Sequence, residues 1–361
     1  MGKMLGGGVE SVVMNYYRHI DHSQVQFDFL VDADSTAVPQ EEIEAMGGRV
    51  LRVPPYQRVH EYLPAMVSLF KENCYRVVHS HVNAVSVLPL MAARLAGVPV
   101  RIAHNHSTSG KGEPLKNAAK YALRPFATLF PTHCLACSDY AARWLFGTDM
   151  FERGSVQVLP NAVELDTFAF DAGVREHTRS GLGVSNSFVV GHVGRFVHSK
   201  NHAFLIDVFS AVKELAPDAV LVLIGDGPLR NETELRVARM GLSESVRFLG
   251  MRSDVSALYQ AMDVLVLPSF YEGFPVVCVE AQASGLCVIA SDLITPEVRL
   301  TDVITFVSLR EAPVVWARAA TATRGVRSRY DDGIRSASSE FDIANSALRL
   351  QRLYVDAVEE L

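Results

Sequence analysis

Few cysteines, no long apolar run and no excess of basic residues characterise this sequence of 361 residues. Its five cysteines, an odd number, do not suit a disulfide framework and are typical of a reducing compartment such as the cytoplasm. Cys134 and Cys137 lie in a run that reads as a strand, and no second pair at zinc spacing follows them. Glu280 interrupts the most apolar region, so no stretch reaches the roughly 18 residues of a membrane-spanning helix. The formal net charge of −6 argues against a nucleic-acid partner.

Short apolar runs alternate with amphipathic segments in both halves of the chain, which predicts α/β structure with parallel sheets. A chain of this length is expected to form two domains. We expect them at residues 1–165 and 187–335, joined by a linker at 166–186, with a helix in 336–361 that packs back on the first domain. The strands are expected at residues 27–31, 50–53, 77–81, 100–106, 133–138, 156–160, 188–194, 219–225, 246–250, 263–268, 287–291 and 303–307.

The stretch 263–291 is predicted to form a strand, a loop, a helix and a second strand. One carboxylate, Glu272, falls in the loop, and a second, Glu280, falls inside the helix. Pro275 suits the first helical position because its missing N–H would be unpaired there, and Gly285 suits the end of the helix.

Glu280 shares a helix face with Val276 and Val277, whose backbone N–H groups belong to the first turn. Such free N–H groups form an anion site. A nucleotide sugar would satisfy all of these groups, with phosphate at the helix start, ribose at Glu280 and the sugar at Glu272. The alternative is that both glutamates are solvated surface residues.

The run LPSFYEGFPVVCVEAQASG, residues 267–285, resembles the Glu-x7-Glu signature of retaining glycosyltransferases with the GT-B fold. That group consists of enzymes like those of glycosyltransferase family 4 and includes bacterial exopolysaccharide and capsule transferases. The resemblance extends along the chain through the motifs GGGVE, AHNH, LPNAVELDTF, GRFVHSKN, IGDGP and VRFLGMRSDV. It implies two doubly wound, Rossmann-like domains that face each other across a cleft.

The resemblance also implies a reaction and a set of site residues. A hexose or related sugar would pass from a nucleotide-diphosphate sugar to a glycan or lipid-linked acceptor, with retention, in exopolysaccharide, capsule or lipopolysaccharide synthesis. Glu272 and either His104 or His106 would act at the transferred sugar, and Glu10 would contact the acceptor. The implied donor site consists of Gly8, Gly194, Arg195, Lys200, Gly225, Arg252, Gly273, Phe274, Pro275, Val276 and Glu280.

Arg195 and Lys200 both follow the strand expected at 188–194. Two cations in one loop without adjacent carboxylates are costly unless an anion joins them, and a leaving diphosphate is the natural candidate. The resemblance implies that no metal and no cofactor are needed, since these cations and the helix dipole would neutralise the diphosphate. The alternative is that both cations pair with acidic residues across the cleft. In the motif IGDGP, Gly225 would permit the close approach of a backbone.

His79 and His81 end one predicted strand, and His104 and His106 end the next. Alternation with a period of two places the histidines of each pair on one face. Four histidines suggest a metal site, but these strand ends lack the nearby carboxylates or cysteines of a catalytic metal centre. The resemblance assigns the contact with the sugar to His104 or His106 and does not decide between them.

A basic stripe of Lys116, Lys120 and Arg124 at four-residue spacing lies in the segment 109–130. Such an amphipathic helix can lie on an anionic membrane, although an ordinary solvated helix face has the same pattern. The cysteine content predicts a cytoplasmic protein, and the basic stripe would allow a contact at the inner face of the plasma membrane.

The glycines at positions 6–8 precede a predicted helix at 9–20. In the family that the chain resembles, such a loop follows the first, central strand of the N-terminal sheet, whereas only residues 1–5 precede it here. We expect that strand and some upstream residues to be missing, with a slot in the core and reduced stability as consequences.

Two other functions compete with this interpretation of the sequence. A nicotinamide dehydrogenase would need Gly-x-Gly-x-x-Gly after its first strand, and neither GGGVES nor IGDGPL has that spacing. A non-catalytic or truncated module that binds nucleotide sugars remains compatible with all the motifs.

Overall fold

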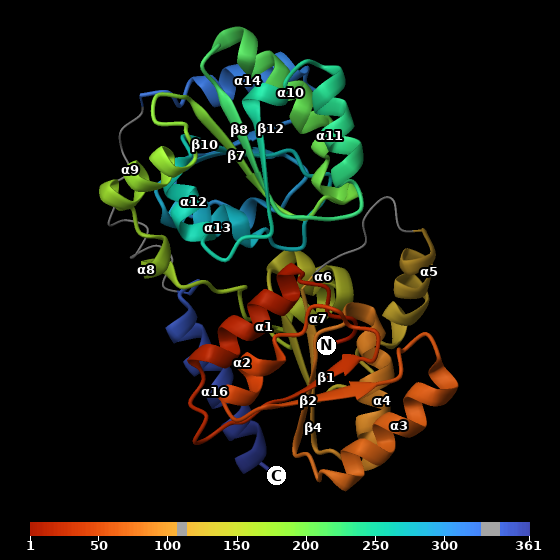
Figure 1. The fold of residues 1–361 in the computed structure, drawn as a ribbon. Coiled ribbons are helices and arrows are strands. Elements are labelled where there is room, and N and C mark those ends of the chain that lie inside the picture. The colour runs from red at the N-terminus through yellow and green to blue at the C-terminus, as the bar shows by residue number, and fades with distance from the viewer. Residues whose placement is uncertain (107–113, 326–339) are drawn as a thin grey trace. The chain divides into compact units, whose positions relative to one another are not determined.

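The computed structural model describes residues 1–106, 114–325 and 340–361, with only the backbone described at 114–116 (Figure 1). The chain divides into two compact units. The first holds the described residues up to Val163 together with Glu340–Leu361, and the second holds the described residues from Glu164 to Gly325.

The second unit is built on a six-stranded parallel sheet in the order β12-β11-β10-β7-β8-β9. Its strands are β7 (Val189–Val193), β8 (Val220–Ile224), β9 (Val246–Gly250), β10 (Val264–Leu267), β11 (Cys287–Ser291) and β12 (Ile304–Val307). Its helices are α8 (Leu165–Phe168), α9 (Ala172–Gly181), α10 (His202–Leu215), α11 (Arg230–Arg239), α12 (Val255–Ala261), α13 (Val276–Ala283) and α14 (Pro313–Thr321). The chain leaves β7 in one direction for β8 and β9 and returns to its other side at β10. This reversal places the loops after β7 and β10 side by side.

Helices cover both faces of this sheet, with α10, α11 and α14 on one face and α12 and α13 on the other (Figure 1). All four residues of β10 are buried, as expected for a parallel strand covered on both sides. The inward residues of α10, which include Leu205, Phe209 and Val212, recur at helical spacing and pack on β7 and β8.

The first unit contains two separate parallel sheets rather than one. β1 (Asp28–Asp32) pairs with β2 (Arg49–Val53). The other sheet has the order β3-β4-β5-β6 and consists of β3 (Val77–Ser80), β4 (Val100–Asn105), β5 (His133–Ala136) and β6 (Gln157–Val158). The helices are α1 (Gly8–His19), α2 (Gln40–Ala45), α3 (Val59–Glu72), α4 (Val87–Ala96), α5 (Pro114–Leu123), α6 (Asp139–Phe146), α7 (Thr148–Glu152) and α16 (Ile343–Glu359). Each of the twelve strands found in the described residues overlaps a predicted range.

The C-terminal helix α16 belongs to the first unit, although it lies at the other end of the sequence. The side chain of Gln351 accepts a hydrogen bond from the N–H of Asp21 and donates one to Gln24. Arg76 donates to the carbonyl of Val358 at 2.9 Å. These contacts attach α16 to the segment between α1 and β1 and to the start of β3.

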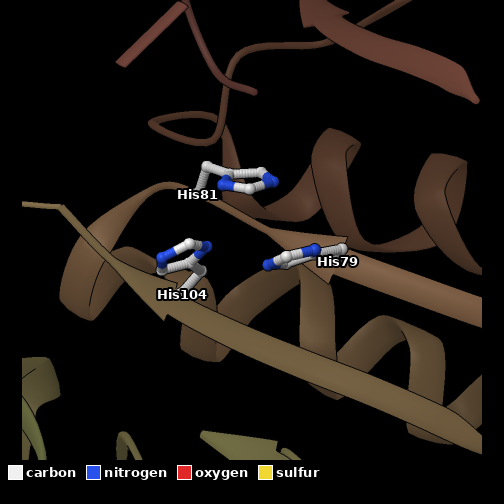
Figure 2. Close-up of side chains that lie close together, drawn as sticks. All are labelled: His79, His81 and His104. Carbon is white, nitrogen blue, oxygen red and sulfur yellow. The ribbon is translucent and has the colours of Figure 1, made fainter. Parts of the chain in front are cut away.

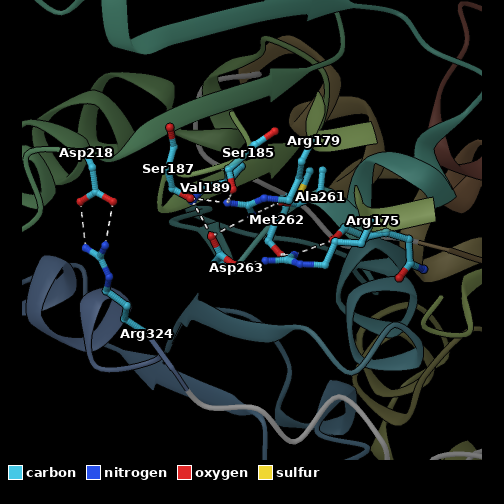
Figure 3. Close-up of polar contacts among 11 residues, drawn as sticks. Arg175, Arg179, Ser185, Ser187, Val189, Asp218, Ala261, Met262, Asp263 and Arg324 are labelled. Carbon is cyan, nitrogen blue, oxygen red and sulfur yellow. Dashed lines mark hydrogen bonds and ion pairs between the residues drawn. The ribbon is translucent and has the colours of Figure 1, made fainter. Parts of the chain in front are cut away.

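The linker expected at residues 166–186 contains α9 and most of α8. Two arginines of α9 converge on the carboxylate of Asp263, just before β10 (Figure 3). Arg175 lies 2.5 Å and Arg179 3.2 Å from it, and the N–H of Val189 donates to the same carboxylate at 2.7 Å. Arg179 is 8% exposed. Helix α9 is therefore attached to the start of β10 through charged side chains.

Candidate active site

The candidate site of the second unit lies at the carboxyl ends of β7 and β10, where the strand order reverses. Open α/β sheets bind ligands at such a position. Three contacts join the loop after β7 to the loop after β10. The N–H of Phe270 donates to the carbonyl of Ser199 at 2.8 Å, and the rings of Phe270 and His198 stack at 5.0 Å. The third contact is the ion pair between Lys200 and Glu272.

Lys200 Nζ lies 2.7 Å from Glu272 Oε1, and each side chain is only 14% exposed. The expectation that Lys200 has no carboxylate beside it is therefore wrong. Its partner is 72 positions away in the sequence and becomes a neighbour because β10 pairs with β7. Each charged group neutralises the other in a partly desolvated position. An anion that approaches Lys200 would draw the ammonium away from Glu272 and leave that carboxylate available to hydroxyl groups.

Glu280 lies in α13, which begins at Val276 with Pro275 as its N-cap. Pro275 therefore precedes the first helical residue instead of occupying it, and Gly285 follows the helix with a φ of +61°. The hydroxyl of Tyr259 donates to Glu280 Oε2 at 2.8 Å, and burial raises the pKa of Glu280. Tyr259, on α12, is fully buried and was not predicted as a site residue. It orients the Glu280 carboxylate.

Gly225 and Gly227 allow the loop after β8 to pack directly against the loop after β7. Gly225 has a φ of +129°, and a Cβ there would lie 2.2 Å from the carbonyl oxygen of Gly194. Gly227 has a φ of +156°, and its Cβ would lie 2.7 Å from the carbonyl oxygen of Phe196. The close backbone approach predicted for Gly225 is thus made to the protein's own loop. At Gly194 itself a Cβ would lie 3.0 Å from Lys200 Cε, so this glycine leaves room for the lysine stem.

Two buried histidines flank the loop after β7, His192 in β7 and His202 at the start of α10. His192 Nδ1 donates to the carbonyl of Val266 at 2.8 Å, which connects β7 to β10. The ring of His202 stacks on Phe196 at 4.1 Å. Burial lowers the pKa of His192 to about 4 and that of His202 to about 2, so both rings are neutral at neutral pH. Neither was predicted, because one histidine in a strand and one at a helix start give no signal of their own.

The remaining predicted donor residues of this unit lie in three places. Arg195 is half-buried in the loop after β7, and Gly273 and Phe274 lead into the first turn of α13. Arg252 is instead exposed beyond β9 and forms a bidentate pair with Asp254 at 2.7 and 2.6 Å. In the structure, the charge of Arg252 is therefore already balanced by a neighbour two residues away.

In the first unit, Gly8 and Glu10 lie at the start of α1. The carboxylate of Glu10 accepts hydrogen bonds from the N–H groups of Leu5 and Gly7 and so caps the helix. This structural role was not expected for the residue predicted to contact the acceptor. Nothing lies within 4 Å of a Cβ built at Gly8, so the protein's own packing does not require a glycine there.

Four histidines gather where β3 and β4 end, and Figure 2 shows three of them, His79, His81 and His104. As predicted, each pair shares a face, with ring centroids 4.1 Å apart for His79 and His81 and 4.0 Å apart for His104 and His106. His106 Nδ1 lies 3.0 Å from Asn161 Oδ1, which can only accept, so Nδ1 carries the proton. His106 Nε2 then accepts from His81 Nδ1 at 2.9 Å. These bonds determine the tautomer of His106.

Burial lowers the pKa of His79 to about 3 and that of His106 to about 4. His104 and His106 are 2% and 5% exposed, and the structure does not single out one of them as the contact with the sugar. One nitrogen from each of His79, His81 and His104 lies within 4.8 Å of the others. Neutral imidazoles at this spacing form a donor set of the kind that transition metals use. The expectation that no metal takes part remains a prediction.

The basic stripe is only partly described. α5 ends at Leu123, a short 3-10 turn (Arg124–Phe126) follows, and the side chain of Lys116 lies outside the described residues. Lys120 is half-buried, and the guanidinium of Arg124 lies 5.4 Å from the ring centroid of Trp144. Among the helices in the described part of the chain, none is both long enough and apolar enough to cross a lipid bilayer.

Comparison with protein families matches both units. Residues 7–162 match the glycosyl transferase 4-like domain, and residues 174–301 match the glycosyl transferases group 1 family. The putative glycosyltransferase EpsF of Bacillus subtilis (strain 168) is 40% identical over 332 residues, which cover 89% of this chain and 86% of the relative. A galactosyltransferase of Escherichia coli, which acts on α-D-GlcNAc-diphosphoundecaprenol with UDP-Gal, is 32% identical over 240 residues, or 64% of this chain and 61% of the relative.

Solved structures resemble the whole chain in fold. Anabaena Alr3699/HepE, in complex with UDP and glucose, has a TM-score of 0.80 at 20% identity and covers 98% of both chains. Sucrose-phosphate synthase of Thermosynechococcus elongatus has a TM-score of 0.78 at 20% identity and covers 100% of this chain and 96% of its own.

Proposed function

Because this chain belongs to the glycosyltransferases and has the GT-B fold of two Rossmann-like domains, we propose that it transfers a sugar with retention of the anomeric configuration. The donor is a nucleotide-diphosphate sugar, and the acceptor is a glycan or a lipid-linked saccharide of exopolysaccharide, capsule or lipopolysaccharide synthesis. The relationship to EpsF and to the galactosyltransferase that acts on a diphosphoundecaprenol substrate supports this class of acceptor.

The observation that carries the proposal is the ion pair of Lys200 with Glu272 beside the start of α13. The diphosphate binds to the N–H groups of Val276 and Val277 and takes the Lys200 ammonium as its counter-ion. Glu272 is thereby released and accepts hydrogen bonds from the sugar hydroxyls. Glu280, held by Tyr259, accepts from the ribose. One displaced ion pair thus couples binding of the phosphate to binding of the sugar.

The retaining step proceeds on one face of the sugar. The departing phosphate oxygen takes the proton of the acceptor hydroxyl, while Lys200, Arg195 and the α13 dipole stabilise the charge on the diphosphate. Glu272 and neutral His106 position the sugar and stabilise its developing positive charge. Glu10 contacts the acceptor through a carboxylate whose position its capping bonds fix. The reaction takes place at the cytoplasmic face of the membrane, where Lys116, Lys120 and Arg124 approach anionic lipid.

A transfer assay with a panel of nucleotide sugars tests the proposal, with the anomeric configuration of the product read by NMR. We expect product in the donor's configuration and an unchanged rate in excess EDTA, because the charge stabilisation comes from side chains and a helix dipole. Loss of activity in EDTA that added metal restores would contradict the metal-free site. Binding without turnover over the whole panel would favour the non-catalytic module.

Glu280→Gln and Glu272→Gln are expected to separate nucleotide binding from sugar transfer. Glu280→Gln keeps an oxygen for Tyr259 but loses the charge that faces the ribose, so binding of the bare nucleotide diphosphate should weaken about tenfold or more. Glu272→Gln frees Lys200 from its ion pair, so it should leave that binding intact or slightly stronger while transfer falls sharply. Isothermal calorimetry measures the binding, with Glu232→Gln, an exposed residue of α11, as the control. Equal losses in both variants would show that the two roles are not separate.

A further inference from the structure

The register between β3 and β4 brings three of the four clustered histidines together. It pairs Ser80 with Ala103 in parallel. The next positions along the two strands, His81 and His104, therefore lie side by side. Residues two positions apart share a face of a strand, which places His79 on the same side as His81. In Figure 2 the three rings surround one point, and one nitrogen from each ring lies within 4.8 Å of the other two.

Hydrogen bonds to groups outside this trio orient two of the rings. His81 Nδ1 donates to His106 Nε2 at 2.9 Å, which leaves the lone pair of His81 on its Nε2. His79 Nδ1 lies 2.6 Å from the hydroxyl of Tyr354 in α16, which can accept its proton. A histidine that binds a metal almost always has its other ring nitrogen bonded in this way, because the second bond sets the tautomer and the direction of the ring.

Buried ring nitrogens of the trio lack a partner in the described part of the chain. Neither nitrogen of His104 meets hydrogen-bond geometry with a described residue, and the same holds for His79 Nε2. Burial holds the pKa of His81 and that of His104 well below the usual range, so both rings are neutral and each keeps a lone pair. Buried polar atoms are rarely left unpaired, because the loss of their contact with water is then not offset. An ion bound among these nitrogens would offset it.

We propose that His79, His81 and His104 bind one Zn²⁺ ion through one nitrogen of each ring. A tetrahedral zinc ion with Zn–N distances of about 2.1 Å holds its nitrogens about 3.4 Å apart, which small rotations of the rings achieve from the present spacing. Three neutral imidazoles suit zinc, whereas Mg²⁺ and Ca²⁺ prefer oxygen ligands. The fourth ligand is a water molecule. It and the ion enter through a cavity of about 610 Å³ in the first unit, which His79 and His81 line.

The zinc ion has a structural role, because it joins the ends of β3 and β4. The proposed diphosphate site belongs to the second unit, so this ion takes no part in stabilising the charge of the leaving group. His106 forms its bonds to His81 and Asn161 without the ion. Transfer in EDTA is therefore still expected to proceed at an unchanged rate, and the zinc site does not depend on the proposed function.

Titration of the metal-free full chain with Zn²⁺ tests the proposal. Isothermal calorimetry should show one ion per chain, and Zn²⁺ at about 100 times its Kd should raise the Tm by about 4 °C or more, whereas Mg²⁺ should do neither. His79→Asn keeps a polar atom at the position of Nδ1 for Tyr354 but lacks Nε2, so the affinity for Zn²⁺ should fall at least about a hundredfold. His60→Asn, at an exposed residue of α3, is the matched control and should leave the affinity unchanged.

Two further measurements separate this site from weak binding at the surface and from loss of folding. Tyr354→Phe keeps all three ligands and removes only the hydroxyl that bonds His79, so Zn²⁺ should bind about 10- to 100-fold more weakly. Co²⁺, which takes the same ligands and absorbs visible light strongly in a tetrahedral site, should give that absorption in the unchanged chain and not in His79→Asn. The proposal is overturned if the chain binds no Zn²⁺, if His79→Asn binds it with unchanged affinity, or if bound Co²⁺ lacks the tetrahedral absorption.

Discussion

Replacement of Lys200 with alanine is expected to lower the turnover of sugar transfer about a hundredfold at saturating donor, or about 2.7 kcal/mol of transition-state stabilisation. Lys200 is the cation that the ion pair holds between the loop after β7 and the loop after β10. In the proposed reaction, Lys200 stabilises the negative charge that develops on the diphosphate as the glycosidic bond breaks. The loss should therefore fall on kcat, and an unchanged kcat would remove Lys200 from the site.

The ion pair complicates this test, because removing Lys200 leaves Glu272 as an unpaired carboxylate that is only 14% exposed. Lys200→Met, which keeps the length of the stem, should lower the Tm as well as the turnover. The double variant Lys200→Met/Glu272→Gln removes both charges and should recover the Tm but not the turnover. Arg310→Ala, at an exposed cation of the same unit, serves as the control and should leave both unchanged. If the double variant recovered turnover as well as the Tm, the role of the ion pair would be purely structural.

Gly225→Ala should lower the free energy of unfolding of the second unit by about 3 kcal/mol or more. Two causes add. The backbone has a φ of +129°, and the new Cβ would meet the carbonyl oxygen of Gly194 at 2.2 Å, where only backbone can move. Since Gly194 precedes the loop that carries Lys200, the displaced backbone should also lower transfer.

Gly241→Ala is the matched control, because Gly241 has a φ of +70° and nothing lies within 4 Å of its Cβ position. The Gly241→Ala variant should lose only about 1 kcal/mol of the free energy of unfolding, because alanine is less stable than glycine at a positive φ. Urea unfolding in a Trp144→Phe background reports on the second unit, since Trp316, the other of the two tryptophans, lies in that unit's core. Equal losses of the free energy of unfolding in the two variants would contradict the prediction. They would show that the loops after β7 and β8 can move apart to accept the new Cβ at no energetic cost.

The sequence by itself determined the position and type of most elements. A buried parallel strand must be a short apolar run, and all twelve such runs became strands. Alternation with a period of two placed His79 beside His81 and His104 beside His106, because strand geometry is local. The position of Glu280 in a helix that stops before Gly285 followed from turn chemistry in the same way.

Only the tertiary structure decided which charged and polar groups meet. Lys200 faces Glu272, Glu280 receives the Tyr259 hydroxyl, and Asp263 holds two arginines of α9. None of these contacts lies within one element. They depend on the order of strands in the sheet, which places β10 beside β7 although β8 and β9 intervene in the sequence. That order is set by the total burial of many apolar side chains and not by any local pattern, so the sequence predicted the individual residues of the site but not their partners.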